Sequence, residues 1–97
     1  MTEASPGPSL YDSFLQFLPV ENLAPSDRRA VLDEMAHNVV RVVALGGSTS
    51  RHDVLERLTT DFGYLPSDAG AAVLHATDQG FLVDRGMPSQ LMPPDEA

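Results

Sequence analysis

The stretch GGSTSRHDVLERLTTDFGYLPSDAGAAVLHATDQGFLV, residues 46–83, decides the fold, because apolar side chains recur in it at helical spacing between glycine-rich breaks. Intervals of three and four residues predict a helix over residues 51–62 and a second helix between Pro66 and Gly80. Gly63 suits the left-handed cap between the two. The apolar face of the first helix is Val54, Leu55, Leu58 and Phe62, and that of the second is Ala69, Ala72, Val73 and Ala76.

A helix cap and a hairpin are predicted at the two ends of this stretch. Ser50 and Asp53 approximate a capping box for the helix that follows them. At the other end, residues 81–83 (Phe-Leu-Val) predict a short strand and residues 84–86 a turn. A return strand is expected over residues 89–92. The stretch therefore predicts two helices followed by a β-hairpin.

A longer helix is predicted upstream, over residues 26–45. Ser26 and Asp27 suit its beginning, and the glycine pair at 46–47 suits its end. Its second half, VVRVVAL, is β-branched but keeps the helical phase of the preceding residues, so we interpret it as helix. The apolar series is Val31, Leu32, Met35, Val39, Val42 and Val43.

A short amphipathic helix is expected over residues 10–18, before Pro19. Its apolar stripe consists of Leu10, Phe14, Phe17 and Leu18. An apolar stripe of this size is unfavourable in water, so we expect it to pack on the rest of the domain or on a second copy of the chain.

Length and composition limit the function classes. A chain of 97 residues fits one small domain, expected over residues 10–86 between a flexible tail at 1–9 and a Pro-rich acidic tail at 87–97. The net charge of −8 is the wrong sign for binding a phosphate backbone unaided. Without cysteine there is no disulfide or thiolate chemistry. We find no secretory signal or membrane segment and expect a cytoplasmic protein.

The fold class predicted from these signals is mainly α, a small winged-helix-like bundle of about four helices with a short C-terminal β-hairpin. Residues 39–83 resemble a winged helix-turn-helix domain. The matching features are a helix, the break GGSTS, a helix with the core VLERL, the turn FGYLPS, a third helix, and Gly-Phe-Leu-Val entering a wing. Domains of this kind bind DNA, proteins or both, so the resemblance implies the fold more than the function.

In a DNA-reading member of that superfamily the third helix would enter the major groove. Here that helix has no Lys or Arg and carries Asp68 and Asp78, which would repel the flanking phosphates. A DNA-binding transcriptional regulator is therefore the alternative hypothesis. The residues that would contact DNA are Arg51, Arg57, Ser67, Gln79 and Arg85.

Two weaker resemblances imply other functions. The same stretch is similar to the helical half of PqqD-like peptide-recognition domains, but residues before Gly46 are predicted as helix where those domains have a peptide-binding sheet. The run ALGGSTSRHDVLERLTTDFG also resembles the Leu-Gly-Gly-x-Ser stretch of acyl or peptidyl carrier proteins. Thr49 stands at the position of the modified serine, with Ser48 and Ser50 one place out of register. A helix cap explains the same letters.

No catalytic signature is present. The three histidines are far apart in sequence, and His52 with Glu56 fits a surface helix pair better than a metal site. Asp33 and Glu34 are adjacent and should face different directions. We therefore expect no enzyme activity, no cofactor and no metal.

The leading hypothesis is a non-catalytic protein- or peptide-binding module, such as an accessory or regulatory subunit, that binds another protein or a peptide, or that pairs with itself as a homodimer through Leu10, Phe14, Phe17 and Leu18. Leu74 either anchors a protein contact or packs under Phe81 or the N-terminal helix. The residues expected to bind a partner are Leu74, His75, Asp78, Phe14, Phe17 and Leu18.

Overall fold

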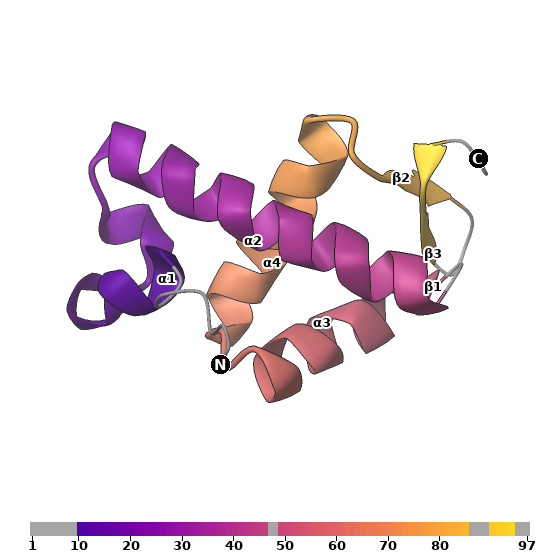
Figure 1. Cartoon of the computed structure of the whole chain (residues 1–97), viewed down its shortest axis with the longest axis horizontal. Helices are drawn as coiled ribbons and strands as arrows, with labels where there is room; N and C mark the ends of the chain where they lie inside the picture. Colours follow the sequence, from indigo (N-terminus) through magenta and orange to yellow (C-terminus); the bar gives the residue numbers. More distant parts are fainter. Residues whose placement is uncertain (1–9, 47–48, 86–89, 95–97) are drawn as a thin grey trace, which may run out of the picture.

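The computed structural model describes residues 10–46, 49–85 and 90–94. Within them the chain is mainly helical and ends in a short antiparallel hairpin, which confirms the predicted fold class (Figure 1). The elements in chain order are α1 (Leu10–Ser13), the 3-10 turns η1 (Leu15–Phe17) and η2 (Val20–Asn22), α2 (Pro25–Gly46), β1 (Thr49–Ser50), α3 (Arg51–Asp61), α4 (Pro66–Asp78), β2 (Val83–Arg85) and β3 (Gln90–Met92).

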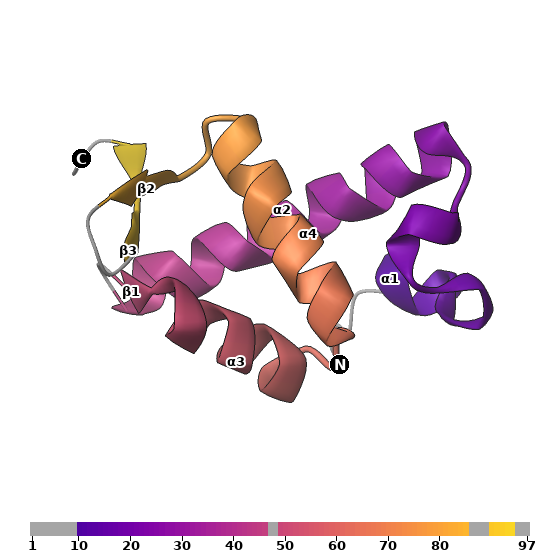
Figure 2. The same ribbon diagram turned by 180° about the vertical axis from the view of Figure 1, so that it is seen from behind.

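Helix α2 is the centre of the bundle. It matches the helix predicted over residues 26–45 to within one residue at each end. Its β-branched second half is helical because Val39, Val42 and Val43 continue the buried face begun by Val31 and Met35. Helix α4 crosses α2 on the face opposite the viewer in Figure 1, as the reverse view in Figure 2 shows.

The caps predicted at Gly63, Gly80 and Ser50 are confirmed, whereas α2 begins at Pro25, one residue before the predicted Ser26. Gly63 and Gly80 have φ angles of 71° and 78°, the left-handed backbone that glycine adopts without a Cβ clash. Oγ of Ser50 accepts a hydrogen bond from the backbone N–H of Asp53 at 3.1 Å, which is one half of the expected capping box. These caps set the bounds of α3 and α4.

The sheet contains one strand that was not predicted. Its order is β1-β3-β2 and all pairing is antiparallel, with Leu91 of β3 opposite Thr49 on one side and Asp84 on the other. The prediction treated Thr49 and Ser50 only as cap residues, because a two-residue strand has no periodicity to detect. Strand β2 also begins two residues later than expected.

The domain boundary and the turn therefore need correction. Asp84 and Arg85, expected in the turn, are paired in β2, and the rest of the expected turn lies outside the described residues. The boundary predicted at residue 86 is too early, since β3 is the central strand and Leu91 is fully buried. The prolines around β3 gave the segment the composition of a tail, but Leu91 completes the core.

The N-terminal segment also differs from its prediction. The expected helix over residues 10–18 is broken into α1 and η1, and the residue that it buries is Tyr11, which was not part of the predicted stripe. Phe14 and Leu18 pack partly against the core, while Phe17 is 59% exposed. The ring of Tyr11 packs on that of Tyr64 at 4.6 Å between centroids, so Tyr11 and not the predicted stripe provides the buried side chain of α1.

A candidate protein-binding surface on α3 and α4

The buried face of α4 is the one predicted. Ala69, Ala72, Val73 and Ala76 are fully buried, and the helix packs mainly against α2. Leu74 points elsewhere and is 55% exposed, so the alternative in which it packs under Phe81 or the N-terminal helix is wrong. One face of α4 is thus open to solvent, as Figure 2 shows.

Asp68 is not part of that open face. The sequence suggested that Asp68 is exposed, but its exposed fraction is only 1%. One carboxylate oxygen accepts the hydroxyl of Tyr11 and the other accepts the backbone N–H of Val20, each at 2.9 Å. Asp68 also lies in the first turn of α4, where the helix dipole stabilises a negative charge. The carboxylate of Asp68 therefore accepts hydrogen bonds inside the protein and is not accessible to a ligand.

Tyr11 connects three parts of the chain. Its hydroxyl donates to Asp68 and accepts the backbone N–H of Leu65, which precedes α4, at 2.9 Å. Burial is the main cause that raises the pKa of Tyr11 to about 12; the hydrogen bond from Leu65 opposes this, and the bond to Asp68 adds to it. Burial likewise raises the pKa of Tyr64, partly offset by the hydrogen bond from the Asn38 amide. The N-terminal segment is therefore fastened to the base of α4.

His75, expected to contact a partner, instead joins two helices. Its Nε2 lies 2.6 Å from Oδ1 of Asp33 on α2, and its side chain is mostly buried. The neighbouring Glu34 turns the other way, and both of its carboxylate oxygens accept the backbone N–H of Leu10. Asp33 and Glu34 thus bind different elements, as expected for adjacent residues of a helix.

The open face of α4 has little charge. Asp78, at its last position, is the exposed one of its two carboxylates, and the helix contains no Lys or Arg. Ser67 and Gln79, named as readers of DNA, are both exposed but lie at opposite ends of the helix. Between them the face consists of small residues around Leu74, including Gly70, where a Cβ would meet no atom within 4 Å.

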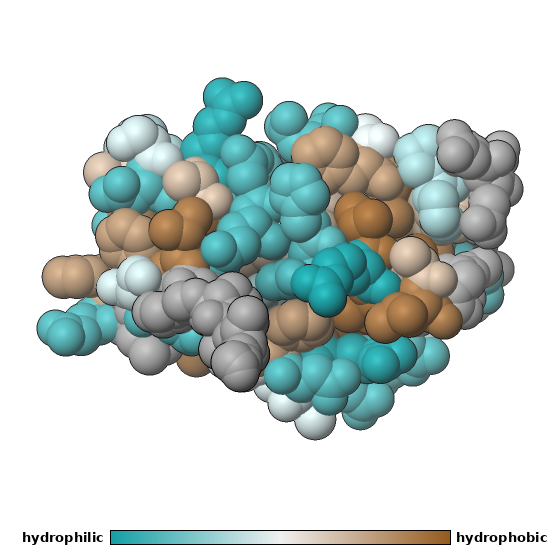
Figure 3. Space-filling view, in the orientation of Figure 1, coloured by the Kyte–Doolittle hydropathy of each residue, from teal (hydrophilic) through white to brown (hydrophobic). Residues whose placement is uncertain are grey.

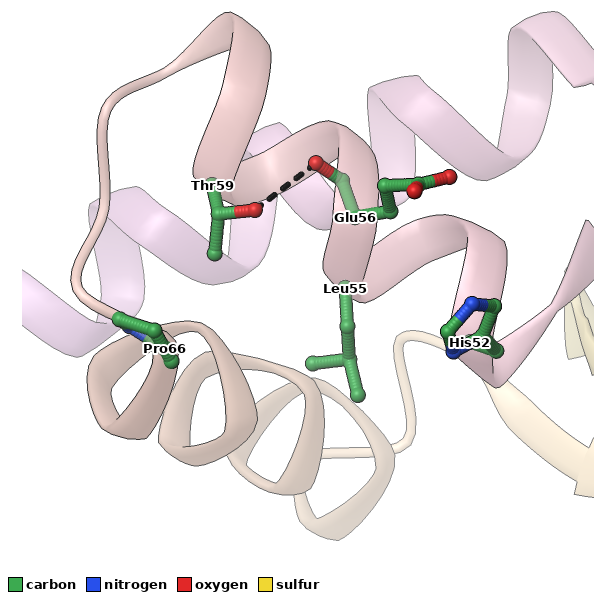
Figure 4. Close-up of a pocket in the computed structure, with 5 residues that line it drawn as sticks. All are labelled: His52, Leu55, Glu56, Thr59 and Pro66. Atoms are coloured by element: carbon green, nitrogen blue, oxygen red, sulfur yellow. Dashed lines mark hydrogen bonds between the residues drawn. The ribbon is translucent and has the colours of Figure 1, made fainter.

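A groove of about 300 Å³, which the sequence did not predict, lies between α3 and the N-terminal end of α4. Its lining from α3 is His52, Leu55, Glu56 and Thr59, and Pro66 closes it from α4 (Figure 4). Leu55 points from α3 toward α4 across the groove. The four α3 positions follow the i, i+3, i+4, i+7 spacing of one helix face, which is the signal that would have found the groove.

Residue spacing along α4 relates Leu74 to Pro66, the residue that α4 contributes to the groove. Pro66, Gly70 and Leu74 are spaced by four residues and so lie on one ridge of the helix. We call the combination of Leu55, Glu56, Pro66, Gly70 and Leu74 the α3–α4 surface. It has an apolar floor and one carboxylate, Glu56, which forms no ion pair within the described residues.

The arginines named for DNA binding are not gathered on α4. Arg57 lies 3.5 Å from Asp61 within α3. Arg51 begins α3 next to β1, and Arg85 ends β2, so these two flank opposite edges of the sheet. The structure does not bring the three together with Ser67 or Gln79.

A second groove lies at the other end of the molecule. Its volume is about 320 Å³, and we call it the N-terminal surface; its lining residues are Phe14, Phe17, Asn22, Leu23, Ala24 and Asp27. Leu18, predicted to belong to the same face, packs partly on the core and does not line it. Figure 3 shows apolar side chains at this end of the molecule, separated by hydrophilic surface along α2 from those near the sheet.

Other candidate chemistry has less support. Ser50 uses its hydroxyl to cap α3, and Ser48 lies outside the described residues. In the described part of the chain no group of three His, Cys, Asp or Glu residues is arranged to hold a metal ion. No helix among these residues is long and apolar enough to cross a bilayer.

Comparisons with protein-family models, with curated proteins and with solved structures find no match to this chain.

Proposed function

We propose that this chain is a non-catalytic protein-binding module that holds a short segment of another protein on the α3–α4 surface. The observation that carries the proposal is the 55% exposure of Leu74 on a helix face without Lys or Arg. An exposed leucine beside an apolar groove is a typical anchor point for a partner side chain. The winged-helix resemblance belongs to the same proposal, supported by the element order from α2 to β3 and by the sheet order β1-β3-β2.

The chemistry of the surface indicates the kind of segment it accepts. Leu55 and Pro66 offer apolar contact, and Gly70 allows the backbone of a partner to come close to α4. Glu56 stands at the edge with a free carboxylate, and the chain as a whole carries a charge of −8. A segment with one or two large apolar residues next to Lys or Arg complements all of these features.

Selection of peptides from a random displayed library on the immobilised full chain tests this proposal. We expect enrichment of apolar sequences flanked by basic residues. The variant Leu74→Ser should weaken binding of the enriched peptides by about tenfold or more, as expected for a central anchor. Leu45→Ser is the matched control, because Leu45 is 82% exposed near the end of α2 and is not part of the surface. Equal binding by wild type and Leu74→Ser, or no enrichment on wild type, would contradict the proposal.

The DNA-binding alternative has its own test. Burial of Asp68 removes one of the two acids that opposed it, but α4 still offers no cation to a phosphate. A gel shift with mixed genomic fragments at low salt discriminates between the two hypotheses. We expect no shifted band at micromolar protein, and steep salt-dependent binding would favour the regulator instead.

A further inference from the structure

The N-terminal surface combines a projecting aromatic ring with a hollow. Phe17 is largely exposed, and the groove beside it is lined by Phe14, Leu23 and Ala24. A ring of this size left in water is costly unless something covers it. The projection and the hollow belong to one patch, so two copies of the patch can each fill the hollow of the other.

Hydrogen bonds on both sides of the patch attach it to the rest of the domain. The N–H of Leu10 is bound by both carboxylate oxygens of Glu34, at 2.9 and 3.1 Å. Further along, the N–H of Val20 is bound by the buried Asp68. Phe17 therefore lies between two fixed points, and a partner that covers it meets a surface that is already ordered.

The charges around the patch suit a second copy of this chain. Residues 21–29 contain two acids, Glu21 and Asp27, and two arginines, Arg28 and Arg29. Within residues 10–46, 49–85 and 90–94 none of these four forms an ion pair. With Asp12 counted, residues 10–29, which contain the whole patch, carry a net charge of −1 although the chain carries −8. Two copies therefore meet here with less repulsion than elsewhere and with opposite charges to pair.

We propose that a second copy of this chain docks on the N-terminal surface about a two-fold axis, with Phe17 of each copy entering the groove of the other. In such an interface the acids at residues 21 and 27 face the arginines of the partner copy, and the same contacts occur twice. The patch lies at the end of the molecule opposite the sheet (Figures 1 and 2). The N-terminal surface shares no residue with the α3–α4 surface, so this inference does not rest on the proposed function.

Analytical ultracentrifugation of the full chain over a wide concentration range tests the dimer. The wild type should pass from monomer to dimer as concentration rises. Phe17→Ser should raise the dimer dissociation constant about thirtyfold or more, as loss of a buried aromatic anchor does. Leu45→Ser, which removes an exposed leucine near the end of α2, should leave the constant unchanged. A wild type that remains monomeric, or a Phe17→Ser variant that associates as tightly as wild type, overturns the proposal.

Charge reversal tests the partner directly. In one variant Glu21→Arg and Asp27→Arg make residues 21–29 wholly basic, and in another Arg28→Glu and Arg29→Glu make them wholly acidic. Each variant alone should remain monomeric because like charges face each other, and an equimolar mixture should form the heterodimer. Circular dichroism spectra that match wild type establish that both variants are folded. A mixture of folded variants that stays monomeric contradicts the reciprocal contacts.

Discussion

The hydroxyl of Tyr11 donates a hydrogen bond to the buried carboxylate of Asp68 at 2.9 Å, across 57 positions of sequence. The bond fastens the N-terminal segment to the first turn of α4 and removes the charge of Asp68 from the surface. What α4 presents to a ligand is therefore an almost uncharged face around Leu74. The same bond orders the segment that carries Phe17.

Removing the carboxylate should destabilise the fold. Asp68→Ala leaves the Tyr11 hydroxyl and the Val20 N–H without their acceptor in the interior, at a cost of roughly 2–5 kcal/mol in the free energy of unfolding. Urea unfolding followed by circular dichroism measures this difference. Asp78→Ala, which removes the exposed acid of the same helix, is the control and should change stability by less than about 0.5 kcal/mol. Equal effects of the two substitutions would mean that Asp68 is not an internal acceptor.

Alkaline pH should weaken the fold through Tyr11. Its pKa is about 12 in the folded chain and 10.0 when unperturbed, so the unfolded state releases the proton first as pH rises. The stabilisation is complete below pH 10 and is lost as pH rises through about 12. Urea unfolding at a series of pH values should show this decline, and Tyr11→Phe should make it shallower. Phenolate absorbance that appears in the folded protein with an ordinary tyrosine pKa would contradict the burial of both tyrosines.

Gly70→Ala should raise the free energy of unfolding by about 0.5–1 kcal/mol. Residue 70 is inside a helix, and a Cβ added there meets no atom within 4 Å. Gly63→Ala is the matched control with the opposite sign. Its φ of 71° strains any residue with a Cβ and should cost about 1–2 kcal/mol. Denaturant midpoints of the two variants give the comparison. A destabilised Gly70→Ala variant would show that a neighbour occupies this side of α4.

The C-terminal strand should be essential for stability although its composition resembles a tail. Leu91→Ala removes a fully buried side chain from the central strand and should cost roughly 2–5 kcal/mol. Truncation after residue 86 removes β3 entirely and should leave little cooperative unfolding in a thermal melt. A truncated chain with the melting temperature of the wild type would show that residues 87–97 are a tail and not part of the folded domain.

The helices were predictable because their signals are local. Spacing, caps and glycine breaks within twenty residues predicted α2, α3 and α4, the buried face of α4 and the turns at Gly63 and Gly80. The face predicted for α3 is only partly correct, because Val54 and Leu58 are buried whereas Phe62 is 38% exposed. The N-terminal segment was not predictable. Whether Phe17 or Tyr11 is buried depends on Tyr64 and Asp68, which are distant in sequence. Strand β1 depends in the same way on Leu91, its partner in the sheet.

For the candidate site, the phase of α4 predicted that Leu74 points away from the buried alanines, but it did not decide whether another element covers Leu74, which is 55% exposed. The roles of His75 and Asp68 did not follow, because a charged or polar residue on a helix flank is buried only if another element supplies a partner. Asp33 supplies it for His75, and Tyr11 and Val20 supply it for Asp68. The groove between α3 and α4 was not predicted, because only Leu55 of its four α3 residues belongs to the apolar series from which the helix was predicted.

The most direct test of the central claim is a chemical-shift titration of the ¹⁵N-labelled full chain, first with the peptide that the wild type enriches and then with duplex DNA at low salt. We predict that the peptide moves the amide signals of Leu55, Gly70 and Leu74 and that DNA leaves them in place. Peptide-induced shifts that avoid α3 and α4, or shifts on α4 produced by DNA alone, would contradict the assignment of this surface to a protein partner.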